Sequence, residues 1–160
     1  MSAADLWVES YQGEVLGEAL FGAMAARETD AEHRAQLEML TLLERATKEL
    51  AEPVLEQRGL DRGDTAATLA TAAQFADALG QASWEDFLGS LAPVTAEFLE
   101  KYNQLVDLAT ADAERDVALA YVAHEQALAA FGRRGLGQEA GDPLELILAL
   151  PHVVAAASAG

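Results

Sequence analysis

Two glutamates interrupt an apolar stripe near the start of the chain. Glu14 and Glu18 occupy positions that recur every three or four residues, a spacing that places them on one face of a helix. The other members of this stripe are Trp7, Tyr11, Phe21 and Ala25. An ionised carboxylate taken out of water is costly unless it is paired or bound to a metal ion. A metal site inside the fold is therefore the first chemistry that these residues suggest.

Later segments carry isolated polar residues in the same kind of setting. Glu44 lies in an apolar helical pattern, and Glu97 lies in the middle of a later helical segment. His124 shares a stripe with Tyr121 and Leu128. Carboxylate oxygens and imidazole nitrogens are both common metal ligands in proteins. Several of these groups directed at one interior would form a metal centre.

The positions of these residues relative to the predicted turns place them at one level. In two antiparallel helices joined by a tight turn, residues equally far from the turn lie side by side. The midpoint of Glu14 and Glu44 falls in one predicted turn, and the midpoint of Glu97 and His124 falls in another. All four side chains could therefore converge in the middle of a bundle.

Composition limits the classes of partner. The chain has 160 residues, of which 27 are acidic and 10 are basic, and its formal net charge is −17. This charge argues against binding to nucleic acids or anionic membrane surfaces, and it favours attraction of cations. There is no cysteine, so disulfides and thiolate metal ligands are excluded. The start of the chain lacks the basic and apolar segments of a signal peptide, which predicts a cytoplasmic protein.

The apolar residues follow a helical period almost throughout, and no segment indicates a strand. We therefore expect an all-α chain that forms a single domain over residues 1–160. Long helices are predicted at 4–28, 31–57, 93–108 and 112–131, with shorter ones at 65–79 and 142–150. Gly89 and Pro93 are expected to break or bend a helix that starts near Ser83, and Pro151 follows the last helix.

The order of these segments predicts the architecture. Two pairs of long helices, each joined by a tight turn, are separated by a long connection that contains the helix at 65–79. This order predicts an antiparallel four-helix bundle with a helical crossover between the second and third long helices and a short C-terminal helix. The apolar tail, residues 144–159, is too short and too often interrupted to span a bilayer.

Three segments carry a resemblance to the ferritin-like superfamily, which includes rubrerythrins and bacterial di-iron carboxylate proteins. These segments are residues 11–18, 40–47 and 121–128. Such proteins hold two metal ions with a Glu from each of two helices and a Glu-x-x-His from each of the other two. The resemblance implies a bundle with an interior iron or manganese site and redox chemistry with dioxygen or peroxide.

The chain departs from that pattern at two positions. Thr47 stands where the second helix should carry a histidine, and Tyr121 stands where the fourth should carry a glutamate. Carried over residue by residue, the resemblance implies these metal ligands: Glu14 or Glu18, Glu44, Glu97 and His124, with Glu125 as a substitute. Tyr121 and Thr47 would then form hydrogen bonds to the metal ligands without binding the metal themselves. One imidazole with several carboxylates suits one metal ion better than two.

A second interpretation stays open because both Glu-x-x-His motifs are broken. The chain could be a metal-free binding or interaction module, forming a homodimer through an exposed apolar helix face. The same polar residues would then form a buried hydrogen-bond network or line a pocket for a small molecule, and an Arg or Lys among them would favour this interpretation. Lys48 and Lys101, each four residues after a candidate glutamate, also offer Glu44 and Glu97 ordinary surface pairs. No sequence feature identifies a substrate or a reaction.

Overall fold

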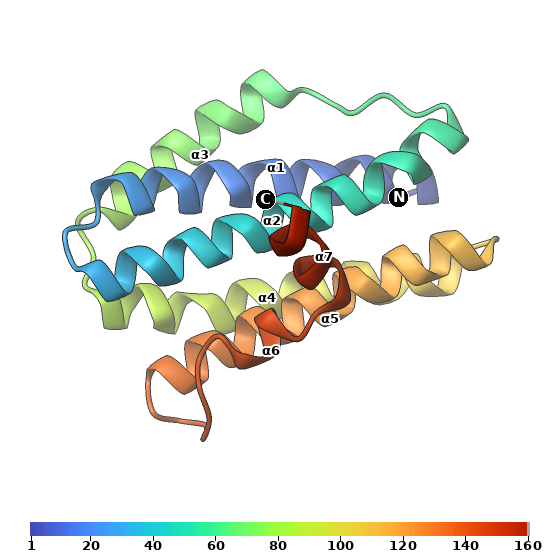
Figure 1. The fold of residues 1–160 in the computed structure, drawn as a ribbon. Helices are drawn as coiled ribbons and strands as arrows, with labels where there is room; N and C mark the ends of the chain where they lie inside the picture. Colours follow the sequence, from blue (N-terminus) through green and yellow to red (C-terminus); the bar gives the residue numbers. More distant parts are fainter. Residues whose placement is uncertain (160) are drawn as a thin grey trace.

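The computed structural model describes residues 1–159 and is all-α over that range (Figure 1). The helices are α1 (Ala3–Arg27), α2 (Ala31–Arg58), α3 (Thr65–Leu79), α4 (Trp84–Leu108), α5 (Asp112–Gly135), α6 (Glu145–Leu148) and α7 (Pro151–Ala159). The prediction of an all-α chain is confirmed, and the tight turns at 28–30 and 109–111 lie where the sequence placed them.

Local sequence explains where the helices begin and end. The side chain of Asp30 accepts a hydrogen bond from the His33 backbone N–H at the start of α2, and Asp64 caps α3 in the same way. These caps satisfy amide groups that have no partner within the helix. At the end of α2, Gly59 has a φ of 63°, a left-handed conformation that glycine adopts without strain.

The long helices pack as two antiparallel pairs, α1 with α2 and α4 with α5 (Figure 1). The α3 helix lies along α1, and α7 packs against α2. Two hydrophobic core clusters occupy different levels of the bundle. One contains Leu6, Trp7, Tyr11, Val15, Ala51, Val54, Leu55, Tyr102, Leu105, Val106, Val117, Ala118 and Tyr121. The other includes Phe21, Leu37, Leu40, Leu43, Phe87, Leu88, Leu91, Leu128, Phe131, Ile147 and Val153. The level between the two clusters is where the candidate polar residues of α1, α2 and α5 lie.

The α4 helix continues without a break through Gly89 and Pro93, so the prediction that a helix ends there is wrong. A proline inside a helix lacks the N–H that would bond the carbonyl four residues earlier, here that of Gly89. Both residues are exposed, so that carbonyl faces solvent. On the opposite face, Leu88, Leu91 and Thr95 are buried in the bundle. Packing of this face therefore carries the helix through the proline.

The C-terminal segment also differs from its prediction. Instead of one helix at 142–150, the chain forms the short α6 and then α7, which begins at Pro151. Proline suits the first position of a helix because its missing N–H has no partner there in any case. The α5 helix also continues to Gly135, four residues beyond its expected end at Phe131.

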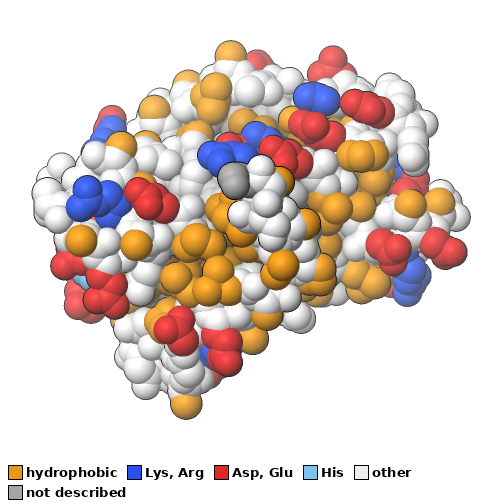
Figure 2. Space-filling model, viewed as in Figure 1, with side chains coloured by type: hydrophobic (Ala, Val, Ile, Leu, Met, Phe, Trp, Pro, Cys, Tyr) orange, Lys and Arg blue, Asp and Glu red, His pale blue; other side chains and the backbone are white. Residues whose placement is uncertain are grey.

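Hydrophobic side chains gather around the C-terminal segment on the face shown in Figure 2, with acidic and basic side chains around them. The exposed large hydrophobic residues of this segment are Leu146, Leu148 and Val154. A homodimer through an apolar face stays a prediction. Within residues 1–159, no helix combines the length and the apolar composition that crossing a membrane requires.

An ion pair ties the end of α2 to the start of α5. Two guanidinium nitrogens of Arg58 donate to the two carboxylate oxygens of Glu114 at 2.7 and 2.9 Å. The Thr110 backbone N–H donates to the same carboxylate at 3.0 Å. The hydrogen bonds from Arg58, against some opposition from desolvation, lower the pKa of Glu114 from 4.5 to about 2.

We expect Glu114→Gln to lower the free energy of unfolding at pH 7 by about 1–3 kcal/mol, because the amide loses charge-assisted hydrogen bonds. A carboxylate whose pKa is depressed by folding stabilises the protein above its ordinary pKa of 4.5 and loses that contribution as the pH falls through about 2. Urea denaturation from pH 7 down to pH 2 should therefore show the two proteins converging. Glu97→Gln, at an exposed position, is the control, and a difference that stays constant with pH would contradict the assignment.

Candidate metal centre

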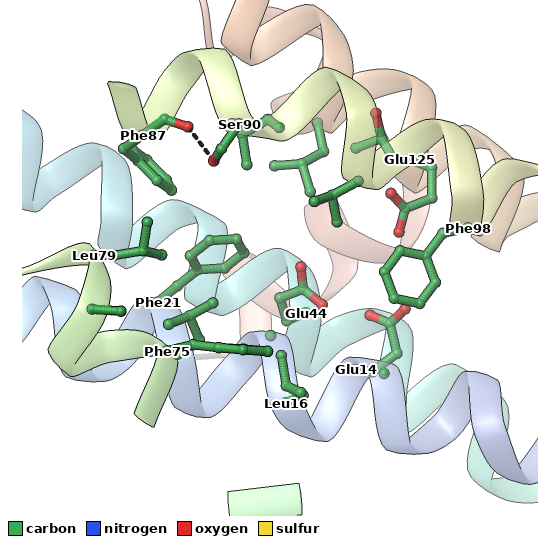
Figure 3. A pocket seen from close by; sticks show the side chains of 18 of the residues that line it. Glu14, Leu16, Phe21, Glu44, Phe75, Leu79, Phe87, Ser90, Phe98 and Glu125 are labelled. Atoms are coloured by element: carbon green, nitrogen blue, oxygen red, sulfur yellow. Dashed lines mark hydrogen bonds between the residues drawn. The ribbon is translucent and has the colours of Figure 1, made fainter. Parts of the chain in front are cut away.

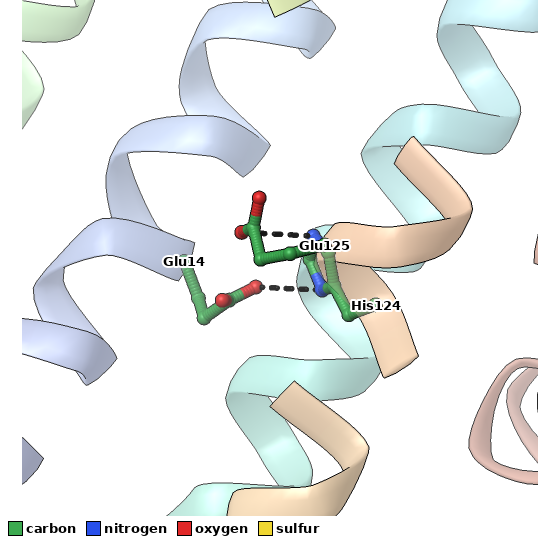
Figure 4. Close-up of side chains that lie close together, drawn as sticks. All are labelled: Glu14, His124 and Glu125. Carbon is green, nitrogen blue, oxygen red and sulfur yellow. Dashed lines mark ion pairs between the residues drawn. The ribbon is translucent and has the colours of Figure 1, made fainter. Parts of the chain in front are cut away.

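Three carboxylates and one imidazole meet between the two core clusters. Glu14 comes from α1, Glu44 from α2, and His124 and Glu125 from α5. All four residues are buried, with His124 at 0% and Glu14 at 1% exposure. Figure 4 shows the Glu14 and Glu125 carboxylates each facing one of the two nitrogens of the His124 ring.

The His124 ring lies within ion-pair distance of each carboxylate. Its Nδ1 is 3.4 Å from Glu14 Oε2, and its Nε2 is 3.3 Å from Glu44 Oε1 and 3.9 Å from Glu125 Oε1. One ligand atom from each of Glu14, His124 and Glu125 can be chosen so that all three lie within 4.8 Å of one another. This group could hold a metal ion.

Thr47 fixes which nitrogen of His124 carries a proton. Its hydroxyl lies 3.0 Å from the Leu43 carbonyl, 2.9 Å from His124 Nδ1 and 2.9 Å from His152 Nε2. A hydroxyl has one proton and two lone pairs, and a carbonyl only accepts. The hydroxyl therefore donates to Leu43 and accepts from both rings. His124 carries a proton on Nδ1, which leaves Nε2, on the side of Glu44 and Glu125, to bind a proton or a metal ion.

His152 completes this arrangement from the C-terminal helix. Burial, together with the positive charge that His124 can carry, lowers the pKa of His152 to about 4. The ring is therefore neutral at pH 7, and its proton lies on Nε2, facing Thr47. In this way α7 supports the orientation of the His124 ring through a single hydroxyl.

The carboxylates are in an environment that disfavours their charge. Burial, and then the nearby Glu44 and Glu125 carboxylates, raise the pKa of Glu14 well above its usual range. Burial likewise raises the pKa of Glu125 to about 8, although His124 acts in the opposite direction. For His124, burial disfavours the imidazolium, but the Glu44 and Glu125 carboxylates outweigh it and raise the pKa. Without a bound cation, burial therefore favours the protonated, neutral forms of Glu14 and Glu125.

Within residues 1–159, no Lys or Arg forms an ion pair with Glu14, Glu44 or Glu125, and the only ion-pair partner of these carboxylates is His124. Several polar atoms of the cluster also lack a hydrogen-bond partner: Glu14 Oε2, Glu125 Oε2, His124 Nε2 and the Tyr121 hydroxyl. Buried polar atoms normally have partners, so unpartnered atoms on Glu14, His124 and Glu125, three residues whose ligand atoms lie within 4.8 Å of one another, fit a bound cation.

Gly17 makes room for the Glu44 carboxylate. A Cβ at residue 17 would lie 2.8 Å from Glu44 Oε1, and closer still to the carboxyl carbon. No side chain could stand there without displacing the carboxylate. The glycine therefore lets Glu44 lie against the backbone of α1, one turn from Glu14.

The structure does not bring Glu18 into the cluster. Its carboxylate accepts a hydrogen bond from Arg45 Nε at 2.8 Å and another from Lys48 Nζ. Partial burial works against its charge, but these two bonds outweigh burial and lower the pKa of Glu18. Each residue turns a helix by about 100°, so four residues return Glu18 only approximately to the face of Glu14. That offset places it beside the basic residues of α2, and Lys48 pairs with Glu18 rather than with Glu44.

Glu97 is exposed and likewise lies outside the cluster. The buried face of α4 carries Thr95 and Tyr102. Glu97 follows Thr95 by two residues, which is about 200° around the helix and therefore on the opposite side. The distance of Glu97 from the turn at 109–111 predicts its height along the bundle, but it does not predict the direction in which its side chain points around the helix. Lys101, the expected partner of Glu97, pairs instead with Glu9 of α1 at 2.5 Å.

Aromatic side chains close one end of the cluster. The rings of Tyr102 and Tyr121 lie 4.6 Å apart, and Trp7 packs against Tyr121 at 6.3 Å. The Tyr121 hydroxyl is buried without a partner, and burial together with Glu14 and Glu44 raises its pKa well above 10. Tyr121 therefore remains a neutral hydrogen-bond donor next to the carboxylates.

Sequence reasoning missed His152 and Gly17 as parts of the site. His152 comes from a segment far along the chain, and only the path of α7 brings it to Thr47. A signal for Gly17 was present, because a glycine inside a helix costs about 1 kcal/mol relative to alanine and its place needs a reason.

In comparisons with protein-family models, curated proteins and solved structures, no significant match to this chain was found. The resemblance to ferritin-like proteins stays a prediction from the residues.

We expect Gly17→Ala to lower the free energy of unfolding by about 1–3 kcal/mol, because the added methyl group overlaps the Glu44 carboxylate. Gly22→Ala is the matched control on the same helix, since a Cβ there would lie 3.7 Å from its nearest neighbour, Thr41 Cγ2. That variant should be more stable than the parent by about 0.5–1 kcal/mol. Urea denaturation measures both, and equal effects of the two substitutions would contradict the role assigned to Gly17.

Proposed function

We propose that this chain binds one divalent iron or manganese ion through Glu14, His124 and Glu125, with Glu44 as a further carboxylate beside them. One observation carries the proposal: three buried carboxylates surround one imidazole, and His124 is the only ion-pair partner they have in the described chain. A divalent cation would supply the positive charge that the surrounding protein does not.

Charge and hydrogen bonding favour a cation over a network of hydrogen bonds alone. With His124 neutral and the three carboxylates ionised, the buried cluster carries three negative charges, and a divalent ion would offset two of them. Protons could also neutralise the carboxylates, whereas a divalent ion would offset their charge and at the same time give the unpartnered oxygens of Glu14 and Glu125 a partner. An Arg or Lys paired with these carboxylates would favour a metal-free module, and residues 1–159 contain no such pair.

The donor set favours iron or manganese. Carboxylate oxygens suit magnesium, calcium and manganese, whereas imidazole suits iron, zinc and copper. A set of three carboxylates and one imidazole lies between these groups. Structural zinc sites take mainly cysteine and histidine ligands. The single imidazole of the cluster favours one ion, because His152 points to Thr47 rather than to the carboxylates.

The resemblance to ferritin-like proteins extends this proposal to redox chemistry. The bound metal would supply one-electron chemistry with dioxygen or peroxide. The residues of the chain would hold the site: Thr47 orients His124, Gly17 leaves space for Glu44, and the tyrosines exclude water on one side. Both tyrosines are buried, with Tyr102 at 1% and Tyr121 at 0% exposure.

Metal content tests the proposal directly. Protein expressed with added iron or manganese and then desalted should contain about one ion per chain. Glu14→Gln and His124→Ala should lose that ion, because each removes a ligand from the cluster. Glu18→Gln, one turn away on the same helix and paired with Arg45 and Lys48, should retain it. Elemental analysis measures all four proteins, with circular dichroism to establish that they fold. A parent protein with a metal content near zero would overturn the proposal.

We expect Thr47→Val to weaken Mn²⁺ binding about 10- to 100-fold, the usual effect of removing a partner that orients a ligand. The substitution removes the oxygen that accepts from His124 and His152. Thr41→Val is the control, because the Thr41 hydroxyl makes the same bond to its own helix, to the Leu37 carbonyl, but contacts no imidazole. Isothermal titration calorimetry with Mn²⁺ gives both affinities. Equal affinities in the two variants would show that Thr47 does not position His124.

A further inference from the structure

An apolar groove leads from the surface to the carboxylate cluster. It has a volume of about 430 Å³ and is lined by residues of α1, α3 and α4, with Glu44 of α2 and Glu125 and Leu128 of α5 at its base. This volume is within the range of about 300–1,000 Å³ that is usual for small-molecule sites. Figure 3 shows Glu14 and Glu125 at one end, Glu44 in the middle next to Phe21, and Phe87 and Leu79 toward the other end.

The walls of the groove offer almost nothing to a polar ligand. Two of the residues that line it carry aliphatic hydroxyls, and both hydroxyls bond to their own helix. Ser90 donates to the Phe87 carbonyl at 2.7 Å, and Thr95 donates to the Ala92 carbonyl at 3.0 Å. No Lys, Arg or His lines the groove within the described range. An anionic head group would therefore find no cation in the walls.

The outer end of the groove is accessible between α3 and α4. Phe75 of α3 and Val94 of α4 both line it, and each is 49% exposed. The α3 helix packs along α1, so it forms one wall of the groove. Apolar side chains exposed at the mouth of a concave site are typical of ligand-binding grooves.

The inner end places polar atoms against whatever occupies the groove. Glu14 and Glu125 both line it, both are buried, and each has a carboxylate oxygen without a hydrogen-bond partner. These are two of the three ligands of the proposed metal site. A molecule that fills the groove would therefore bring its inner end to that site.

We propose that this groove binds an uncharged apolar molecule, an alkyl chain or aryl ring system, whose inner end lies against the carboxylate cluster. The inference rests on the proposed function, because such a molecule would be a substrate only if the cluster holds a metal ion. An anion is disfavoured by the three carboxylates and the absence of basic residues in the walls. An organic cation would compete with the metal for the same carboxylates.

Binding of the uncharged dye Nile red tests this inference on the full chain. Its fluorescence should rise on binding, and 1-decanol should displace it. Decanoate should displace it at least tenfold less effectively, because the groove walls hold no basic residue and the three carboxylates keep a net negative charge even with a divalent ion bound. Absence of a fluorescence change would overturn the inference, and so would equal displacement by decanoate. More effective displacement by decylamine than by decanol would overturn it in favour of a site for organic cations.

A substitution at the mouth tests the location. Ala78→Trp places a large ring in the groove from an exposed position of α3, and it should weaken dye binding at least tenfold. Ala73→Trp, exposed on the same helix but outside the groove, should leave binding unchanged. Unchanged binding in Ala78→Trp would show that the dye binds elsewhere and would overturn the inference.

Metal content measured on the same samples separates this inference from the proposed function. Ala78 is outside the carboxylate cluster, so Ala78→Trp should keep its metal. Metal binding without dye binding would overturn the inference alone. Dye binding to a protein that takes up no metal would instead overturn the proposed function and leave a pocket for apolar molecules.

Discussion

The burial of three carboxylates around one imidazole is the constraint on which the rest of this structure depends. Glu14, Glu44 and Glu125 are buried in the middle of the bundle, where desolvation and repulsion by neighbouring carboxylates disfavour the charge of Glu14 and of Glu125. Apolar side chains at these positions would pack without such a cost, so the folding energy of the two flanking core clusters must offset it. A group of residues this costly to bury is usually a functional site.

Several features of the fold are explained by the need to bury this polar layer, which consists of Glu14, Glu44, His124 and Glu125. The hydrophobic core is divided into two clusters, one on each side of it. Gly17 gives up helix propensity so that Glu44 can lie against α1. The C-terminal chain turns back across α2, where His152 reaches the hydroxyl that also holds His124. Gly17 makes room for a carboxylate of the cluster, and His152, through Thr47, helps to fix the direction of the imidazole.

The groove and the polar layer form one continuous site. The groove is lined by α1, α3 and α4, and α1 contacts α4 much less than α1 contacts α2 or α4 contacts α5. The groove supplies apolar contact area, and the cluster supplies carboxylate oxygens at its inner end. This division of roles, apolar walls with a few fixed polar groups, is the usual construction of a small-molecule site.

Local sequence was enough to predict most of the helices and to name the four residues that meet in the cluster. Helical periodicity and the capping residues Asp30 and Asp64 located α1, α2 and α3, and the distance of Glu14 and Glu44 from their common turn placed both at one level. The stripe also identified His124, because each of these inferences uses only local spacing along one helix or across one turn. Rotation of a helix about its axis is decided instead by packing against its neighbours. Tertiary structure alone therefore turned Glu97 to solvent, paired Glu18 with Arg45 and Lys48, carried α4 through Pro93, and brought His152 to Thr47.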